Sequence, residues 1–206
     1  MIDAALIEKC ADPSMTVAIV TQFINAAGAD DPLTLTIKSN GRLVLVPKPG
    51  TPDEALAVLS DYVGKAGVRV GITQMPAGVG ITDGSQLGLS LFDSCANLKT
   101  GTAMFAKVAR IVTQWYESPT NADLLPQMVD DAIFAWKTGY FEGTEVFGAA
   151  DPGGATFLSK KGSKDHSPAK QSEEAPIAVA KDERVDDRSI GKSEMRIDLS
   201  RIGGRK

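Results

Sequence analysis

The sequence predicts a mainly helical α+β domain over residues 1–150, with one small β-hairpin, followed by a disordered polar tail over residues 151–206. Three observations support this. Apolar residues recur at helical spacing in several segments. Two runs rich in β-formers flank Asn40-Gly41, which is a strong hairpin signal. After Asp151 the apolar pattern stops.

The N-terminal half is expected to begin with two helices, over residues 4–10 and 16–27. Ser14 is available as N-cap of the second, and Gly28 ends it. The hairpin pairs residues 33–37 with residues 43–46.

Three further helices are expected. One starts at Thr51-Pro52, where Glu54 completes a capping box, and runs to about Lys65. The others cover residues 94–116, capped by Asp93, and residues 122–138. Between the first and second of these helices, residues 68–92 are rich in glycine and are expected to form an irregular loop with short extended pieces.

The tail has a different composition. Residues 159–194 consist mostly of Lys, Ser, Glu and Asp, which cannot bury enough apolar surface to offset chain entropy. Residues 195–202 (MRIDLSRI) alternate apolar and polar side chains. They either add as a strand to a partner's sheet edge or are a tail with scattered hydrophobic residues.

Charge and composition exclude several classes of function. The chain has a net charge of −4, and residues 1–150 carry 10 Lys+Arg against 16 Asp+Glu. A domain of this sign does not bind nucleic acid by neutralising phosphates. No apolar run approaches the length of a membrane-spanning helix. The N-terminus does not resemble a signal peptide, which taken literally predicts a cytoplasmic protein.

The two cysteines, Cys10 and Cys95, leave two alternatives open. Joined, they would stabilise the fold by roughly 4 kcal/mol, and separate, they would be ordinary buried thiols. The single histidine, His166, lies in the tail, so we expect no metal site and no other cofactor.

Four stretches resemble the lysozyme-like transglycosylase subunit of type IV secretion systems. Residues 92–102 (FDSCANLKTGT) resemble that family's F-D-P-C-x-N-L-x-x-G-A, and residues 70–75 (VGITQM) resemble V-G-x-G-Q-I. Residues 132–141 (AIFAWKTGYF) resemble A-L-x-x-Y-N-x-G-x-F, and residues 31–35 (DPLTL) resemble N-P-L-A-I. The resemblance covers residues 5–148.

The resemblance implies a lysozyme-like fold, a glycan cleft and a Cys10–Cys95 disulfide. The disulfide in turn implies an oxidising compartment, the periplasm. The cleft residues it implies are Gln74, Trp136 and Lys137, where the family has Gln and the Tyr-Asn pair. Gln74 either hydrogen-bonds a glycan amide or holds its own loop. Trp136 either stacks on a sugar or belongs to the core.

The catalytic glutamate of such enzymes is missing. Counting along the motifs puts Ala27 or Phe23 at its position, and no glutamate occurs between Glu8 and Glu54. Neither Ala nor Phe can transfer a proton. Asp30 and Asp31 are the weak substitutes, although Asp30-Asp31-Pro32 is also typical of a turn that opens the hairpin.

A narrower resemblance covers the whole chain. The opening MIDAALIEKC and the closing RIDLSRIGG are similar to the TraH-type conjugal transfer proteins of Agrobacterium and rhizobial plasmids. We therefore expect a conjugal transfer component with a non-catalytic domain that binds peptidoglycan or docks on type IV secretion channel proteins. The alternatives are an active lytic transglycosylase that uses Asp30 or Asp31, and a cytosolic adaptor or secreted cargo.

Overall fold

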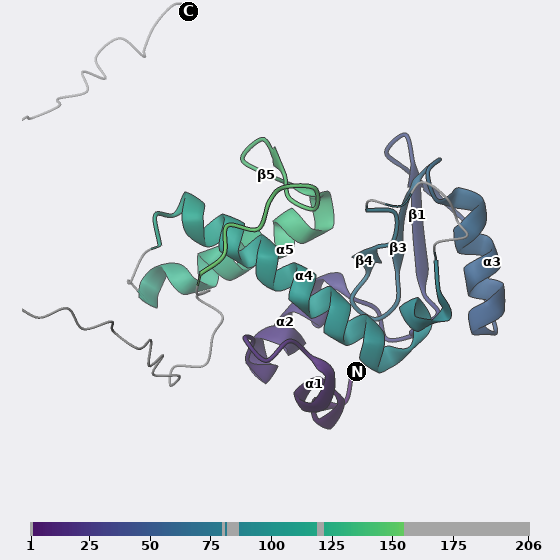
Figure 1. Ribbon diagram of the computed structural model, residues 1–206, viewed down its shortest axis with the longest axis horizontal. Helices are drawn as coiled ribbons and strands as arrows, with labels where there is room; N and C mark the ends of the chain where they lie inside the picture. Colours follow the sequence, from purple (N-terminus) through teal and green to yellow (C-terminus); the bar gives the residue numbers. More distant parts are fainter. Residues whose placement is uncertain (1, 80, 82–86, 119–121, 155–206) are drawn as a thin grey trace, which may run out of the picture. The chain divides into compact units, whose positions relative to one another are not determined.

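The computed structural model describes residues 2–79, 81, 87–118 and 122–154, and Figure 1 shows how their elements are arranged. The helices are α1 (Ala4–Cys10), α2 (Val17–Ala27), α3 (Pro52–Tyr62), α4 (Ser94–Trp115) and α5 (Leu125–Thr138), with 3-10 turns η2 (Leu89–Phe92) and η3 (Ala122–Leu124). The strands are β1 (Leu35–Ser39), β2 (Arg42–Val44), β3 (Gly67–Val70), β4 (Met75–Pro76), β5 (Tyr140–Phe141) and β6 (Thr144–Glu145). The predicted tail beyond Gly154, including residues 195–202 and His166, lies outside the described residues.

The first two helices are confirmed, with one change at a cap. The α2 N-cap is Thr16, whose hydroxyl accepts the N–H of Ile19 at 3.3 Å. The expectation that Ser14 caps this helix was wrong, because the Ser14 hydroxyl donates to the Asp12 carboxylate instead. The helix ends at Gly28 as predicted, where the backbone runs so close to Ile72 that a Cβ would lie 2.4 Å from its carbonyl oxygen.

The predicted hairpin is present, but it belongs to a larger sheet. Asn40 and Gly41 have φ angles of 49° and 77°, which suit the tight turn between β1 and β2. The sheet has the strand order β2-β1-β3-β4 and is antiparallel throughout. A second hairpin joins β5 to β6. The expectation of one small hairpin was therefore incomplete. β3 lies mostly within the expected loop with short extended pieces, and it becomes a strand by pairing with β1 on one side and β4 on the other.

The capped helix α3 starts as predicted, with the Thr51 hydroxyl accepting the N–H of Glu54 at 3.2 Å. The Glu54 carboxylate accepts the N–H of Gly50, one residue before the cap, at 2.7 Å. The helix ends at Tyr62, three residues before the expected Lys65.

The long helix α4 contacts both α1 and α5 (Figure 1). Its Phe105 lies in the centre of the core, stacked on Phe23 of α2 with ring centroids 4.0 Å apart and edge-on to Trp136 of α5. These three side chains are fully buried. The helical spacing of apolar residues predicts Trp115 on the buried face of α4, but its side chain is 53% exposed and packs edge-on to Phe141.

Candidate functional site

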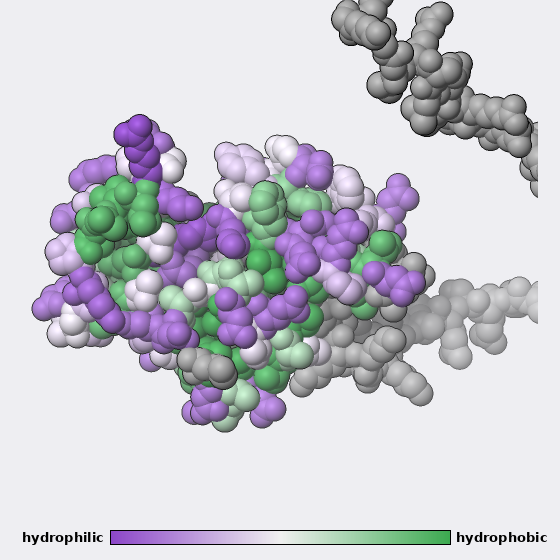
Figure 2. All heavy atoms as spheres, turned by 180° about the vertical axis from the view of Figure 1, so that it is seen from behind, coloured by the Kyte–Doolittle hydropathy of each residue, from purple (hydrophilic) through white to green (hydrophobic). Residues whose placement is uncertain are grey.

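A groove of about 490 Å³ lies between the sheet and the end of α5. Its sheet side is lined by Thr36, Lys38, Gly67, Val68, Arg69 and Pro76, and its helical side by Lys137, Thr138, Gly139, Tyr140, Glu145 and Phe147. Figure 2 shows, from behind, hydrophilic side chains in the hollow between these two parts. The volume falls within the range of small-ligand pockets, about 300–1,000 Å³.

Local backbone structure forms both sides of the groove, which we call the sheet wall and the helical wall. On the sheet side, Arg69 of β3 stands opposite Thr36 of β1 and Pro76 of β4 in the strand register. On the helical side, α5 ends at Gly139, whose φ of 84° turns the chain into the β5–β6 hairpin. This turn brings Tyr140, 58% exposed, to the groove next to Lys137.

Arg69 joins the two walls. Its guanidinium donates to the Gln74 carbonyl at 3.0 Å, to the Trp136 carbonyl and to the Lys137 carbonyl at 3.3 Å. Its central carbon also lies 5.3 Å from the centre of the Phe147 ring. Burial lowers the pKa of Arg69 to about 10, because removal of water disfavours the charged form. The guanidinium is therefore a half-buried cation at the carbonyl end of a helix, where positive charge is favourable.

The groove also holds two exposed lysines. Among the described residues, Lys38 and Lys137 make no side-chain hydrogen bond or ion pair. The acid in the lining, Glu145, accepts the N–H of Phe147 at 3.1 Å and of Gly148 at 2.6 Å, one with each carboxylate oxygen. Glu145 therefore fixes the turn after β6 and leaves the lysines without a carboxylate partner.

The sequence-predicted cleft residues divide into two groups. Lys137 lines the groove, and so does Pro76, which follows the predicted Gln74 segment. The Gln74 side chain is buried, and its amide donates to the Gly71 carbonyl at 2.9 Å and the Thr34 carbonyl at 3.3 Å. Of the two roles considered for Gln74, the structure shows the one that holds the loop.

Trp136 lies in the core. Its side chain is fully buried, its indole N–H donates to the Thr73 carbonyl at 3.1 Å, and its ring meets Phe147 edge-on at 5.4 Å. A ring without exposed surface has no face for a sugar, so the core alternative is the one that the structure bears out.

Both candidate positions for the missing glutamate lie away from the groove lining. Phe23 is fully buried against Phe105, and Ala27 is the half-buried last residue of α2. An acid at position 23 would enter the apolar core without a partner, which is strongly unfavourable.

The substitute acids also lie outside the groove lining. Asp31 accepts the N–H of Leu33 at 2.9 Å and pairs with Lys48 at 2.8 Å. The Lys48 hydrogen bond, followed by that of Leu33, lowers the pKa of Asp31 below its ordinary value. The lowered pKa favours the ionised carboxylate, whereas glycan cleavage requires a neutral acid. Asp30 is exposed. The turn interpretation of this segment is thus supported by the Thr34 N–H, which donates to the Asp31 carbonyl at 3.0 Å.

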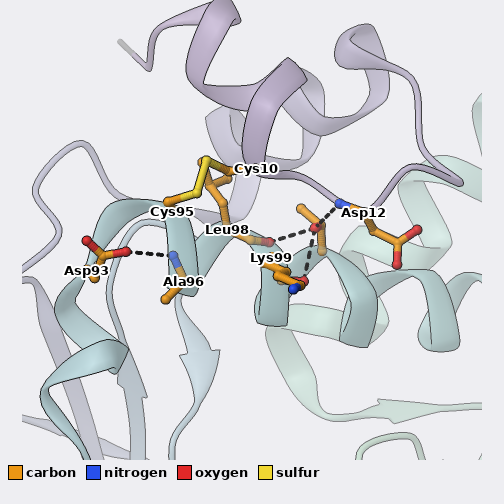
Figure 3. The surroundings of a disulfide bond; sticks show 8 residues. Cys10, Asp12, Asp93, Cys95, Ala96, Leu98 and Lys99 are labelled. Carbon is orange, nitrogen blue, oxygen red and sulfur yellow. Dashed lines mark hydrogen bonds between the residues drawn. A yellow bond between two sulfur atoms is a disulfide. The ribbon is translucent and has the colours of Figure 1, made fainter.

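The disulfide between Cys10 and Cys95 is present (Figure 3). It links the last residue of α1 to the first turn of α4, with the two Cα atoms 5.1 Å apart. Asp93 caps α4 as predicted, accepting the N–H of Ala96 at 2.8 Å. Just beyond Cys10, the N–H of Asp12 donates to the Thr102 hydroxyl at 2.8 Å, so two cross-links hold α1 to α4.

Two features are absent from the described residues. No group of three or more His, Cys, Asp or Glu lies where it could hold a metal ion. No helix in this part of the chain is long and apolar enough to cross a membrane.

Sequence reasoning missed Arg69 and Tyr140, the arginine that joins the walls and the exposed aromatic ring at the groove. Arg69 lies between two valines, and this alternation is the one local sign that residues 67–70 form a strand. Tyr140 directly follows the glycine that ends α5. The role of either residue can be recognised only once the fold has brought the sheet and the end of α5 together.

Comparison with known proteins places the whole chain in a family. The protein y4dP of Sinorhizobium fredii (strain NBRC 101917 / NGR234) is 50% identical over 204 residues, which is 99% of this chain and 100% of that protein. No solved structure matches the chain, so the lysozyme-like fold stays a prediction. The TraH_2 family matches residues 1–204. The chain therefore belongs to the TraH_2 family of TraH-type conjugal transfer proteins.

Proposed function

We propose that this conjugal transfer protein binds peptidoglycan glycan strands in the groove between the sheet and α5, and that it does so without cleaving them. It would act as a component of the type IV secretion channel through which the plasmid passes. The observation that carries the proposal is the meeting of two sequence segments in one groove. Lys137 belongs to one of the two segments that the transglycosylase resemblance assigns to a glycan cleft, Pro76 directly follows the other, and both residues line the groove.

Tyr140 gives the groove a second property of a sugar site. Its ring is 58% exposed beside Lys137, so it presents an apolar face with a polar hydroxyl to a ligand. Aromatic rings of this kind can bury the apolar face of a sugar while polar neighbours bond its hydroxyl groups.

The absence of cleavage follows from the proton chemistry. A lytic transglycosylase needs a neutral carboxylic acid beside the glycosidic oxygen. The acid among the groove lining residues is Glu145, and backbone N–H groups bond both of its oxygens. Asp31 is held in its ionised form by Lys48. The groove therefore has the means to hold a strand and lacks a proton donor suited to cutting it.

The periplasm is the proposed location. Disulfides persist in oxidising compartments such as the periplasm. The Cys10–Cys95 bond, which attaches the N-terminal helix to α4, would persist in that compartment. In this compartment the groove would meet the cell wall, and other surfaces of the protein would contact channel proteins.

The test measures binding and cleavage together. Oxidised full-length protein is incubated with purified sacculi, the bound fraction is measured by co-sedimentation, and soluble products are analysed by mass spectrometry. We expect binding without anhydro-muropeptides. Tyr140→Ala should weaken binding about tenfold, because a lost aromatic contact costs about 1.4 kcal/mol.

Phe134→Ala is the matched control, because Phe134 is a similarly exposed aromatic residue of α5, 62% exposed, that does not line the groove. This variant should bind as the wild type does. Equal losses in both variants, or no sedimentation of the wild type, would refute the groove assignment. Anhydro-muropeptides that disappear in Asp30→Asn or Asp31→Asn would instead show an active enzyme.

A further inference from the structure

The charge of the groove is opposite to that of the domain around it. Residues 1–150 carry 10 Lys+Arg and 16 Asp+Glu, yet the charged groups that line the groove are Lys38, Arg69, Lys137 and Glu145. Three cations and one acid share a volume of about 490 Å³ in an otherwise acidic domain. A concave surface of one sign concentrates ligands of the opposite sign.

Two other cations of the domain are paired with acids. Lys48 lies 2.8 Å from the Asp31 carboxylate, and Arg110 binds the Asp151 carboxylate with two nitrogens. The groove cations differ from these two, since Lys38 and Lys137 have no partner among the described residues and Arg69 bonds only to carbonyl oxygens.

Burial makes it energetically unfavourable for the Arg69 cation to have only carbonyl oxygens as partners. Loss of water lowers its pKa to about 10, and carbonyl dipoles compensate a buried cation less than a carboxylate does. An anion that enters the groove would find one partly desolvated guanidinium and two free ammonium groups. Charge complementarity therefore selects an anionic ligand over a neutral ligand of the same shape.

We propose that the groove selects glycan strands whose muramic acid residues carry free lactyl carboxylates, with Lys137 and Lys38 as the groups that pair with them. This inference rests on the proposed function. In intact peptidoglycan the lactyl group is joined to the stem peptide by an amide and has no charge. A strand becomes anionic at each muramic acid where an amidase has removed the peptide, so the preferred ligand is a peptide-free strand.

The test compares three probes of defined chemistry, with affinities measured by calorimetry or fluorescence anisotropy. Glycan strands from amidase-treated sacculi carry lactyl carboxylates on a sugar chain. Chitohexaose is a neutral β-1,4 sugar chain with the same N-acetyl groups. Poly-L-glutamate carries carboxylates without a sugar. We expect peptide-free strands to bind about tenfold or more tightly than chitohexaose, and this preference to shrink as salt rises from about 50 mM to about 500 mM.

The variants remove charge without disturbing the walls. Lys137→Gln and Lys38→Gln should each weaken binding of peptide-free strands about fivefold and leave chitohexaose within about twofold of wild type. Lys9→Gln, an exposed lysine of α1 outside the groove lining, is the control for the same change of net charge. Arg69 is left unchanged because it also holds the walls together.

Each outcome tests a separate part of the proposal. Equal affinity for peptide-free strands and chitohexaose would overturn the carboxylate selection and leave glycan binding in place. Equal losses in Lys9→Gln and the groove variants would overturn the assignment of Lys137 and Lys38. Binding of poly-L-glutamate without binding of either sugar chain would overturn both this inference and the proposed function.

Discussion

Removal of the Cys10–Cys95 disulfide should lower the free energy of unfolding by about 4.5 kcal/mol. The bond closes a loop with a sequence separation of 85 residues, and the figure follows from the chain entropy that this loop removes from the unfolded state. Most single domains are stable by about 5–15 kcal/mol, so the loss is a large share of the total.

The structure also says where the loss should appear. α1 is anchored by buried Ile7 and Cys10, by the partly buried Leu6, and by the hydrogen bond from the Asp12 N–H to the Thr102 hydroxyl just beyond it. With the disulfide open, only such non-covalent contacts hold this short helix. We therefore expect faster hydrogen exchange in residues 4–10 than in α4 or α5.

The assay is urea unfolding of the oxidised protein, the reduced protein and the double variant Cys10→Ala/Cys95→Ala. With a denaturant slope of about 2 kcal/mol per molar, the midpoint should fall by about 2 M on reduction. Reductant should not change the midpoint of the double variant, which controls for its effects elsewhere. A midpoint that stays within about 0.3 M on reduction would show that the disulfide does not stabilise the fold.

Three further predictions concern polar contacts. Asn97→Ala should cost about 3 kcal/mol in urea unfolding, because the buried Asn97 side chain forms four hydrogen bonds that tie α4 to β3, to Thr73 after β3 and to η2. A hydrogen bond to Asp131 raises the pKa of Tyr116 to about 12, so stability should fall as pH rises from about 10 to about 12. An ultraviolet tyrosinate transition near pH 12, absent in Tyr116→Phe, would support this. The Arg110 hydrogen bond lowers the pKa of Asp151 to about 2, so its contribution, below about 1 kcal/mol at this exposed site, should vanish as pH falls from about 4 to about 2. If Asp151→Asn shows the same pH dependence as wild type, the pair has no such role.

The elements that the sequence predicted well depend on local chemistry. Thr51-Pro52 starts α3 and Asn40-Gly41 turns the hairpin because a cap and a left-handed turn are set by neighbouring residues. The prediction that Ser14 caps α2 was wrong because a neighbouring residue, Asp12, accepts a hydrogen bond from the Ser14 hydroxyl. A local pattern does not reveal which of two nearby side chains wins such a competition.

The groove could be predicted only in part, because it depends on contacts between distant residues. The transglycosylase resemblance pointed to Lys137, which lines the groove, but also to Gln74 and Trp136, whose side chains face inward. β3 becomes a strand through its pairing with β1, about thirty residues earlier in the chain. Arg69 was missed because its role depends on that pairing and on the end of α5, 67 residues away.

The bonds from Arg69 to the Trp136 and Lys137 carbonyls have a mechanical consequence. Opposite sides of the groove share the Arg69 guanidinium, so neither side can shift without breaking one of its hydrogen bonds. The width of the groove is therefore set before a ligand arrives. A glycan strand would therefore bind in a groove of fixed width. Ordering the protein would cost little entropy, but the groove could adapt little to a thicker chain.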